Sequence, residues 1–260
     1  MDYSLIETEM HGRVGVMRLS RPSALNAVSV AMVEQMMAAL TELEKSARAL
    51  LLTGTGKSFS SGADLSEEVA VQDGAVDFGY SLETHMNPLM SRLRDLSIPW
   101  ISAVRGAAAG VGCSLALAAD MVIASETAYF MQAFSRVGLV PDGGSTHLLV
   151  RGASRVRAME MVLLGDRIPA ARALEWGLVN RVVPDEALEA EALALAERLA
   201  NGPSSLTQTR RMMWQALDNG WDNALALERG EQRTAGRSAD CAEGIAAFLE
   251  KRPAQFKGVK

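Results

Sequence analysis

The segment from Leu51 to Leu65, LLTGTGKSFSSGADL, begins with apolar residues and then carries three glycines, a lysine and four hydroxyl side chains between Gly54 and Gly62. A glycine-rich loop after a strand can bind phosphate, as the P-loop G-x-x-x-x-G-K-[ST] does. Gly56-Lys57-Ser58 matches the second half of that motif, but Leu51 occupies the position of its first glycine. The spacing excludes a P-loop and leaves a loop whose backbone amides can face a negatively charged group.

The composition excludes several other classes of function. The chain has 260 residues, a net charge of −5, 48% hydrophobic residues and 22% charged residues, which is typical of one globular protein with a sizeable core. The longest run of basic residues is the pair Arg210-Arg211, so a nucleic-acid surface is not expected. Cys113 and Cys241 lack metal-type spacing, and the first ten residues do not form a secretory signal. These features predict a cytoplasmic protein.

The first half of the chain alternates between strand-like and helix-like segments. Val14 to Ser20 alternates as a strand does, and the continuous apolar run in ARALLLTG predicts a second, fully buried strand. A helix is predicted over residues 30–45, with methionines facing the core, and another over residues 82–96. Residues 62–79 show no clear period, and a long irregular stretch of this kind is usually functional.

The apolar region from Trp100 to Ala124 is long enough to span a membrane. It contains Arg105, Asp120 and three glycines, and it reads instead as a buried strand, a loop, a helix of small residues and a second strand. After Val156 the patterns are helical, apart from the strand LVNRVV. We predict an α/β fold with mostly parallel strands, with a core over residues 1–200 and a helical region over residues 201–260.

Three segments together resemble one family, the crotonases or enoyl-CoA hydratase/isomerase superfamily. They are FSSGADL from Phe59, IPWISAVRGAAAGVGCSLALAADMVIA from Ile98 and AYFMQAFSRVGLVPDGGSTHLL from Ala128. The resemblance extends over almost the whole chain. It implies a spiral of ββα units, a C-terminal helical region that makes trimer contacts, and a coenzyme A thioester as the substrate.

The resemblance also implies a role for the glycine-rich loop. The backbone amides of Ala63 and Val111 would form an oxyanion hole for the thioester oxygen, which becomes negative when the adjacent carbon loses a proton. The second amide would lie at a helix N-terminus, where the helix dipole adds to the effect. The substrate-binding residues predicted around these two amides are Leu25, Ser61, Asp64, Leu65, Gly110 and Phe134. Asp64 itself is expected to cap a turn.

The carboxylates of the family's hydratases are missing from this chain. Hydratases carry two glutamates, and the matching positions here are Ser114 and Phe134. Without them the usual activation of water is lost. A carboxylate occurs nearby at Asp142, in LVPDGGST, where isomerases of phenylacetate breakdown and aromatic dehalogenases also carry aspartate. We predict that Asp142 is the catalytic acid and base of an enoyl-CoA isomerase, which could also open a ring epoxide.

Alternatives remain open at this stage. Asp142 could cap the following helix instead of reacting. It could be a nucleophile, as in a dehalogenase or thioesterase, although Asn87 occupies the expected histidine position and His85 lies two residues away. The chain could also be a hydratase, or a non-catalytic acyl-CoA-binding subunit. His11 and His147 are expected to be structural, and Glu83 is the next acid to consider.

The resemblance implies that the enzyme needs no cofactor, and no cluster of His, Cys, Asp and Glu has the spacing of metal ligands. No membrane or nucleic-acid partner is expected. We predict a homotrimer or a dimer of trimers, because the C-terminal helices are amphipathic enough to leave apolar faces on a lone subunit. The basic tail KRPAQFKGVK is expected either to contact coenzyme A or to lie free in solvent.

Overall fold

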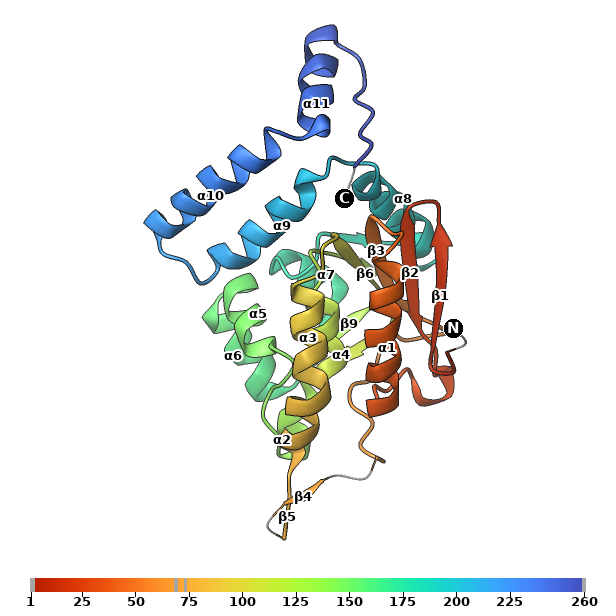
Figure 1. Cartoon of the computed structure of the whole chain (residues 1–260). Coiled ribbons are helices and arrows are strands. Elements are labelled where there is room, and N and C mark those ends of the chain that lie inside the picture. Colours follow the sequence, from red (N-terminus) through yellow and green to blue (C-terminus); the bar gives the residue numbers. More distant parts are fainter. Residues whose placement is uncertain (1–2, 68–69, 73, 259–260) are drawn as a thin grey trace.

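A six-stranded sheet forms the centre of the computed structural model, which describes residues 3–67, 70–72 and 74–258 (Figure 1). The first two strands pair antiparallel and every later neighbour pairs parallel. The strands, in their order across the sheet, are β1 (Ile6–His11), β2 (Val14–Leu19), β3 (Ala49–Gly54), β6 (Trp100–Val104), β8 (Met121–Ser125) and β11 (Arg181–Val183). The predicted α/β fold with mostly parallel strands is confirmed.

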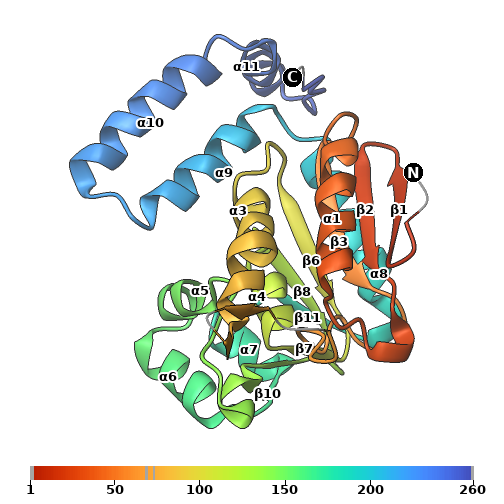
Figure 2. The same cartoon turned by 60° about the horizontal axis from the view of Figure 1, so that its bottom comes forward.

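Helices cover both faces of this sheet. Helix α1 (Val30–Leu43) packs on one face, where Met32 and Met36 are fully buried, as their helical spacing predicted. Helix α8 (Leu188–Ala200) packs on the other face against alternate residues of the same strands (Figure 2). Because side chains alternate between the faces of a strand, β3 is buried along its whole length. This explains its continuous apolar sequence.

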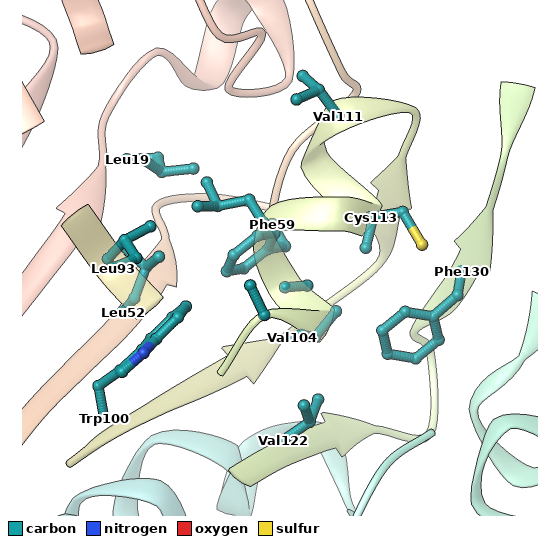
Figure 3. Packing of buried hydrophobic residues seen from close by; sticks show 14 of the residues in the cluster. Leu19, Leu52, Phe59, Leu93, Trp100, Val104, Val111, Cys113, Val122 and Phe130 are labelled. Atoms are coloured by element: carbon teal, nitrogen blue, oxygen red, sulfur yellow. The ribbon is translucent and has the colours of Figure 1, made fainter. Parts of the chain in front are cut away.

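A second, three-stranded sheet was not predicted. It consists of β7 (Ala107–Ala109), β9 (Tyr129–Met131) and β10 (Ile168–Pro169). The segment that was expected to be a loop is thus β7, which pairs parallel with β9 and leads directly into α4 (Val111–Leu117). Figure 3 shows α4 inside the core, with Cys113 and Val111 among buried side chains from both sheets. This second sheet sets where the N-terminus of α4 lies.

The stretch expected to be irregular, residues 62–79, contains a short hairpin of β4 (Val71–Gln72) and β5 (Ala75–Val76). It leads into α2 (Phe78–Ser81), a single π-helical turn η2 (Leu82–Met86) and α3 (Asn87–Arg94). Pro88 explains the wide turn, because its ring has no N–H and would collide with the carbonyl of Thr84 in a regular helix. The Asn87 amide bonds instead to the carbonyl of Leu82, five residues back.

The rest of the chain is mainly helical. Short 3₁₀ helices lie at η1 (Pro22–Ala24), η3 (Ala133–Val137) and η4 (Asp185–Ala187), and the remaining α-helices are α5 (Ser145–Gly152), α6 (Arg155–Leu164), α7 (Ala170–Glu175), α9 (Ser205–Ala216), α10 (Trp221–Ala235) and α11 (Ala239–Glu250). Helix α10 lies in the region 201–260 that was predicted to be helical, although its own segment was not singled out. Figure 1 shows α9, α10 and α11 extending away from the two sheets, and several of their large apolar side chains are exposed, including Trp221 and Phe248.

The long apolar region between Trp100 and Ala124 is divided among β6, β7, α4 and β8. In the described part of the chain, no helix combines the length and the apolar character that crossing a bilayer requires.

Candidate active site

A cavity of about 360 Å³ lies between the N-terminus of α1, the loop from Ala63 to Glu67, the α2–η2 segment and the N-terminus of α4. Asp142 and Val111 form part of its wall, together with Ala63. The three residues predicted to carry the chemistry therefore line the same cavity, although they span 79 positions of the sequence, from Ala63 to Asp142. The cavity gives them a common substrate pocket.

Backbone pairing brings the two predicted oxyanion amides together. The loop carrying Ala63 runs beside β7, because the Ser60 amide donates to the Ala107 carbonyl at 2.9 Å and the Ala109 amide donates to the Ser60 carbonyl at 3.0 Å. Within the described residues, neither the Ala63 amide nor the Val111 amide donates a hydrogen bond to a protein group. Both donors are thus available to a ligand in the cavity.

Glycine is required just before each of these amides. Gly62 has φ +108° and Gly110 has φ +52°, both in the region that side chains disfavour. A β-carbon on Gly62 would stand 3.0 Å from the Ala109 carbonyl oxygen, and one on Gly110 would stand 3.8 Å from the Gly62 α-carbon. At Gly62 both the backbone conformation and the close approach of Ala109 favour glycine, whereas at Gly110, where a β-carbon would fit, the positive φ alone does.

Asp142 projects from a tight turn that precedes α5. The Ser145 amide donates to the Asp142 carbonyl at 3.1 Å, and the residues between them, Gly143 and Gly144, have φ +59° and +77°. Two successive positive φ values are those of a type I′ turn, which glycine adopts without strain. The N-cap of α5 is Gly144, and the Asp142 side chain makes no capping bond. The capping interpretation of Asp142 is therefore wrong.

The Asp142 side chain is half-buried, and its carboxyl group has no hydrogen-bond partner among the described residues. Its Oδ1 atom is inaccessible to solvent and makes no hydrogen bond within the described chain. Removal from water disfavours the charged form, and this burial raises the pKa of Asp142 from its ordinary value of 3.8 to about 6. A carboxyl group whose pKa is near neutral can both take up and release a proton.

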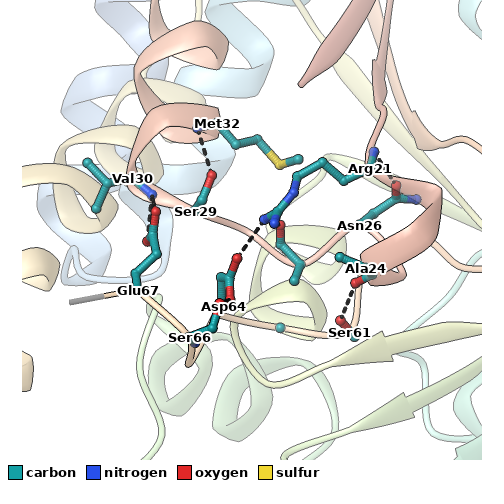
Figure 4. A network of polar contacts seen from close by, with 12 residues as sticks. Arg21, Ala24, Asn26, Ser29, Val30, Met32, Ser61, Asp64, Ser66 and Glu67 are labelled. Atoms are coloured by element: carbon teal, nitrogen blue, oxygen red, sulfur yellow. Dashed lines mark hydrogen bonds and ion pairs between the residues drawn. The ribbon is translucent and has the colours of Figure 1, made fainter. Parts of the chain in front are cut away.

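The two other carboxylates of the cavity wall already have partners (Figure 4). Asp64 accepts hydrogen bonds from the Ser66 hydroxyl at 2.6 Å and from the Arg21 guanidinium at 2.8 Å, which together hold its pKa at about 2. Glu67 accepts a hydrogen bond from the Val30 amide at the start of α1, at 3.0 Å from Oε2. The expected turn role of Asp64 is confirmed, and Asp142 is the carboxylate left for chemistry.

The two positions that carry glutamates in hydratases are buried beside the cavity. Ser114 is fully buried, and its hydroxyl donates to the Asp142 carbonyl at 3.0 Å. Phe134 is 7% exposed, and its ring lies beside Gly110. Gly110 and Phe134 therefore lie next to the start of α4, whereas Asp64 and Leu65 line the cavity directly. Neither glutamate position supplies a carboxylate to the site.

Leu25 and Ser61 lie next to each other, but neither lines the cavity as described. The Ser61 amide donates to the Leu25 carbonyl at 2.9 Å, and the Leu25 side chain is 49% exposed. Leu65, which does line the cavity, is also exposed. The predicted contact of Leu25 and Ser61 with the substrate stays a prediction.

Four residues of the α2–η2 segment also line the cavity: Tyr80, Ser81, His85 and Met86. Residues 66–87 as a whole were expected from the resemblance to line the acyl pocket, but of these four only His85 was considered individually, as a helper of a nucleophilic aspartate. Residues 83 and 87, by contrast, are exposed and do not line it. The π-helical turn sets which side chains of this segment face inward. Pro88 was the available sequence signal for an irregular turn, but it did not indicate which residues the turn would direct into the pocket.

Hydrogen bonds to Thr84 indicate which ring nitrogen of a neutral His85 carries the proton. The Thr84 hydroxyl has one proton and lies 2.7 Å from both the Tyr80 carbonyl oxygen and Nδ1 of His85. Since the carbonyl can only accept, the hydroxyl donates to it and Nδ1 of His85 carries the proton toward the hydroxyl. Nε2 is then the acceptor atom of the neutral ring, and it lies 3.7 Å from the Glu34 carboxylate.

The other sequence-based expectations lie outside this cavity. His11 is paired with Glu9 on β1, and His147 is part of α5. In the tail, the amides of Lys257 and Gly258 bond to Asp240 of α11, at the end of the molecule away from α2 (Figure 1). Among the described residues, no group of three or more His, Cys, Asp and Glu side chains could hold a metal ion.

The fold and the oxyanion-type site define a crotonase, and the comparison with known proteins agrees. The enoyl-CoA hydratase/isomerase family matches residues 9–259, and the chain belongs to this family. It is 46% identical over 254 residues to the 1,2-epoxyphenylacetyl-CoA isomerase of Escherichia coli K12, which covers 95% of this chain and 97% of that protein. It is 43% identical to a probable enoyl-CoA hydratase of Rhodobacter capsulatus, over 99% of this chain and all of that one.

Solved structures give the same result. The crystal structure of an enoyl-CoA hydratase from Bacillus anthracis superposes with a TM-score of 0.92 at 30% identity, over 98% of this chain and 100% of the other. The crotonase fold predicted from the resemblance is therefore confirmed, including the helical C-terminal region. An acyl-CoA isomerase or hydratase activity is supported by these relatives.

Proposed function

We propose that the protein is an acyl-CoA isomerase that moves a double bond through an enolate, with Asp142 as its single acid and base. The observation that carries this proposal is the Asp142 carboxyl group. It is half-buried, with Oδ1 inaccessible to solvent, and its pKa is about 6. It shares a cavity with two backbone amides, and within the described chain neither it nor they have a hydrogen-bond partner. Hydratase chemistry would need further carboxylates, but Ser114 and Phe134 stand at their positions.

In the proposed reaction, Asp142 removes a proton from the α-carbon of a β,γ-unsaturated acyl-CoA. The electron pair moves into the thioester and forms an enolate oxygen, which accepts hydrogen bonds from the Ala63 and Val111 amides. Asp142 then returns the proton to the γ-carbon, and the product is the α,β-unsaturated ester. One carboxyl group carries the proton both ways, so no cofactor is consumed and atoms and electrons balance.

The acyl group is proposed from the relative and from the cavity. The E. coli relative is named for a ring-epoxidised phenylacetyl-CoA, and the cavity here carries Tyr80, Ser81 and His85 among apolar side chains. We therefore include ring-epoxidised arylacetyl esters with unbranched enoyl esters as candidate substrates. Proton removal from the α-carbon would start the reaction of either class.

The proposal is tested by the turnover of a panel of coenzyme A esters. The panel contains 3-enoyl-CoA esters of several lengths, a ring-epoxidised phenylacetyl-CoA, and crotonyl-CoA as the hydratase substrate. We expect conversion of at least one of the first two classes and slow or no hydration of crotonyl-CoA. Efficient hydration would contradict the proposal, and binding without any turnover would favour the non-catalytic alternative.

The nucleophilic alternative is favoured by one observation, the presence of His85 in the cavity. A nucleophilic Asp142 would need a base that activates water to release the acyl-enzyme. Since the enolate route needs no second group, it accounts for the site with fewer residues, and we retain nucleophilic chemistry as the second candidate.

We also propose that the protein is a homotrimer or a dimer of trimers in the cytoplasm. The support is the apolar surface of α10 and α11, where Trp221 is 77% exposed and Phe248 is 82% exposed. The predicted contact of the tail with coenzyme A would then involve a neighbouring subunit. Light scattering that gives a stable monomer mass of 27.8 kDa would contradict the oligomer.

A further inference from the structure

Ser114 makes a contact that its position in the family pattern does not explain. It is fully buried in α4, and its hydroxyl lies 3.0 Å from the Asp142 carbonyl oxygen and 3.4 Å from the Gly110 carbonyl oxygen. The Gly110 carbonyl already accepts the amides of Cys113 and Ser114. The Ser114 hydroxyl therefore donates its hydrogen bond to the backbone carbonyl of Asp142. That carbonyl also accepts the Ser145 amide, so both of its lone pairs are occupied.

The turn after Asp142 packs directly on the same side chain. A β-carbon built on Gly143 would stand 2.8 Å from the Ser114 Cβ and 3.1 Å from Val111 Cγ2. Val111 and Ser114 are three residues apart, so they lie on one face of α4. One helical turn thus carries both an oxyanion amide, at Val111, and the anchor of the acid, at Ser114. The separation between acid and oxyanion hole is set by this turn.

We propose that Ser114 is a positioning residue that holds the Asp142 turn against α4 and so aims the carboxyl group at the carbon beside the thioester. This inference rests on the proposed function, since it concerns the alignment of Asp142.

The test compares two buried serines whose hydroxyls each make one hydrogen bond that involves α4, Ser114 from the helix itself and Ser102 from strand β6. Ser114→Ala removes the hydroxyl that holds the Asp142 carbonyl. Ser102→Ala is the matched control, because the fully buried Ser102 hydroxyl donates to the Ala116 carbonyl of α4 at 2.7 Å and does not touch the acid. Both variants lose one buried hydrogen bond, so we expect similar decreases in Tm. Since misplacing a catalytic group by about 1 Å can lower the rate about a hundredfold, we expect kcat to fall at least about tenfold in Ser114→Ala only.

KM provides the second readout. We expect KM for the acyl-CoA to stay close to the wild-type value in both serine variants, because backbone amides hold the thioester. Equal kcat values in Ser114→Ala and Ser102→Ala would overturn the positioning role. Asp142→Asn is measured alongside: if it retains full turnover, the proposed function fails, whereas an inactive Asp142→Asn with an unaffected Ser114→Ala refutes only the role of Ser114.

Discussion

Replacing Asp142 by asparagine should stabilise the protein at neutral and alkaline pH. The folded-state pKa of Asp142 is raised from 3.8 to about 6, so the folded protein holds the proton more tightly than the unfolded chain does. Well below pH 3.8 the group is neutral in both states and has no effect on stability. Between pH 3.8 and about 6 the unfolded chain releases the proton while the folded protein keeps it, so stability is lost in this window and is constant above about pH 7.

The size of the effect follows from the same two pKa values. Each pH unit between 3.8 and about 6 corresponds to 1.36 kcal/mol, so ionisation of Asp142 lowers the free energy of unfolding by about 3 kcal/mol above pH 7. Asparagine has nearly the same volume and carries no charge. Asp142→Asn should therefore exceed the wild type by up to about 3 kcal/mol at pH 8, or roughly 6 °C in Tm, and by only about 0.5 kcal/mol at pH 4.

The assay is urea unfolding of both proteins at pH 5, 6, 7 and 8, followed by circular dichroism. Asp166→Asn is the control, because Asp166 is an exposed partner of Arg136 and such surface pairs contribute little. We expect the control to follow the wild type at every pH. A stability difference for Asp142→Asn that is constant with pH, or a variant less stable than the wild type at pH 8, would refute the assignment of a buried, unpaired carboxylate.

Three further predictions concern other parts of the account. Turnover should fall about tenfold per pH unit below pH 6, because proton removal requires ionised Asp142; a rate that is flat down to pH 5 in a stopped assay would contradict this. His85→Asn keeps a hydrogen-bond donor toward Thr84 but removes Nε2. We expect kcat for isomerisation to fall less than about tenfold, and a loss of about a hundredfold or more would favour the nucleophilic candidate. Arg210→Met should lower the free energy of unfolding by about 3 kcal/mol or more, because Asp120 then lacks the guanidinium that pairs with it at 2.6 Å in a largely buried position. Arg211→Met, which changes the exposed neighbouring residue, is the control and should have little effect. Similar denaturation midpoints for the two variants would contradict the role of this ion pair.

The main sheet and its covering helix could be predicted because their sequences carry clear periods. Met32 and Met36 recur at helical spacing, and the apolar run of β3 required burial on both faces. The second sheet could not be predicted in this way. Its strand β7 consists of Ala107, Ala108 and Ala109, which have little intrinsic strand preference, and it pairs with a strand about twenty residues further along.

Helix α10 belongs to the region 201–260 that was predicted to be helical, but its own bounds were not predicted. None of its residues is buried in the described chain, so its apolar side chains do not face the core of this subunit. Its position beside α9 depends on pairing between helices that the local sequence does not specify.

The site was predictable where it depends on backbone motifs and less so where it depends on tertiary packing. The G-A-D motif and the small-residue helix motif predicted Ala63 and Val111. The absence of the two hydratase glutamates, at Ser114 and Phe134, made Asp142 the predicted acid. His85 and Tyr80 line the cavity. His85 lies in the π-helical turn, which has one more residue than a regular turn, and Tyr80 lies in α2 just before it. The raised pKa of Asp142 depends on burial by distant segments, so the sequence alone could not predict it.

The most direct test of the account is the exchange of the α-proton of a saturated acyl-CoA with D₂O, measured by mass spectrometry for the wild type and Asp142→Asn. A saturated ester cannot isomerise, so the measurement isolates proton removal at the carbon beside the thioester. We predict exchange by the wild type and a decrease of at least about a hundredfold in Asp142→Asn, with similar binding of the ester. Exchange by Asp142→Asn at the wild-type rate would contradict the assignment of Asp142 as the base.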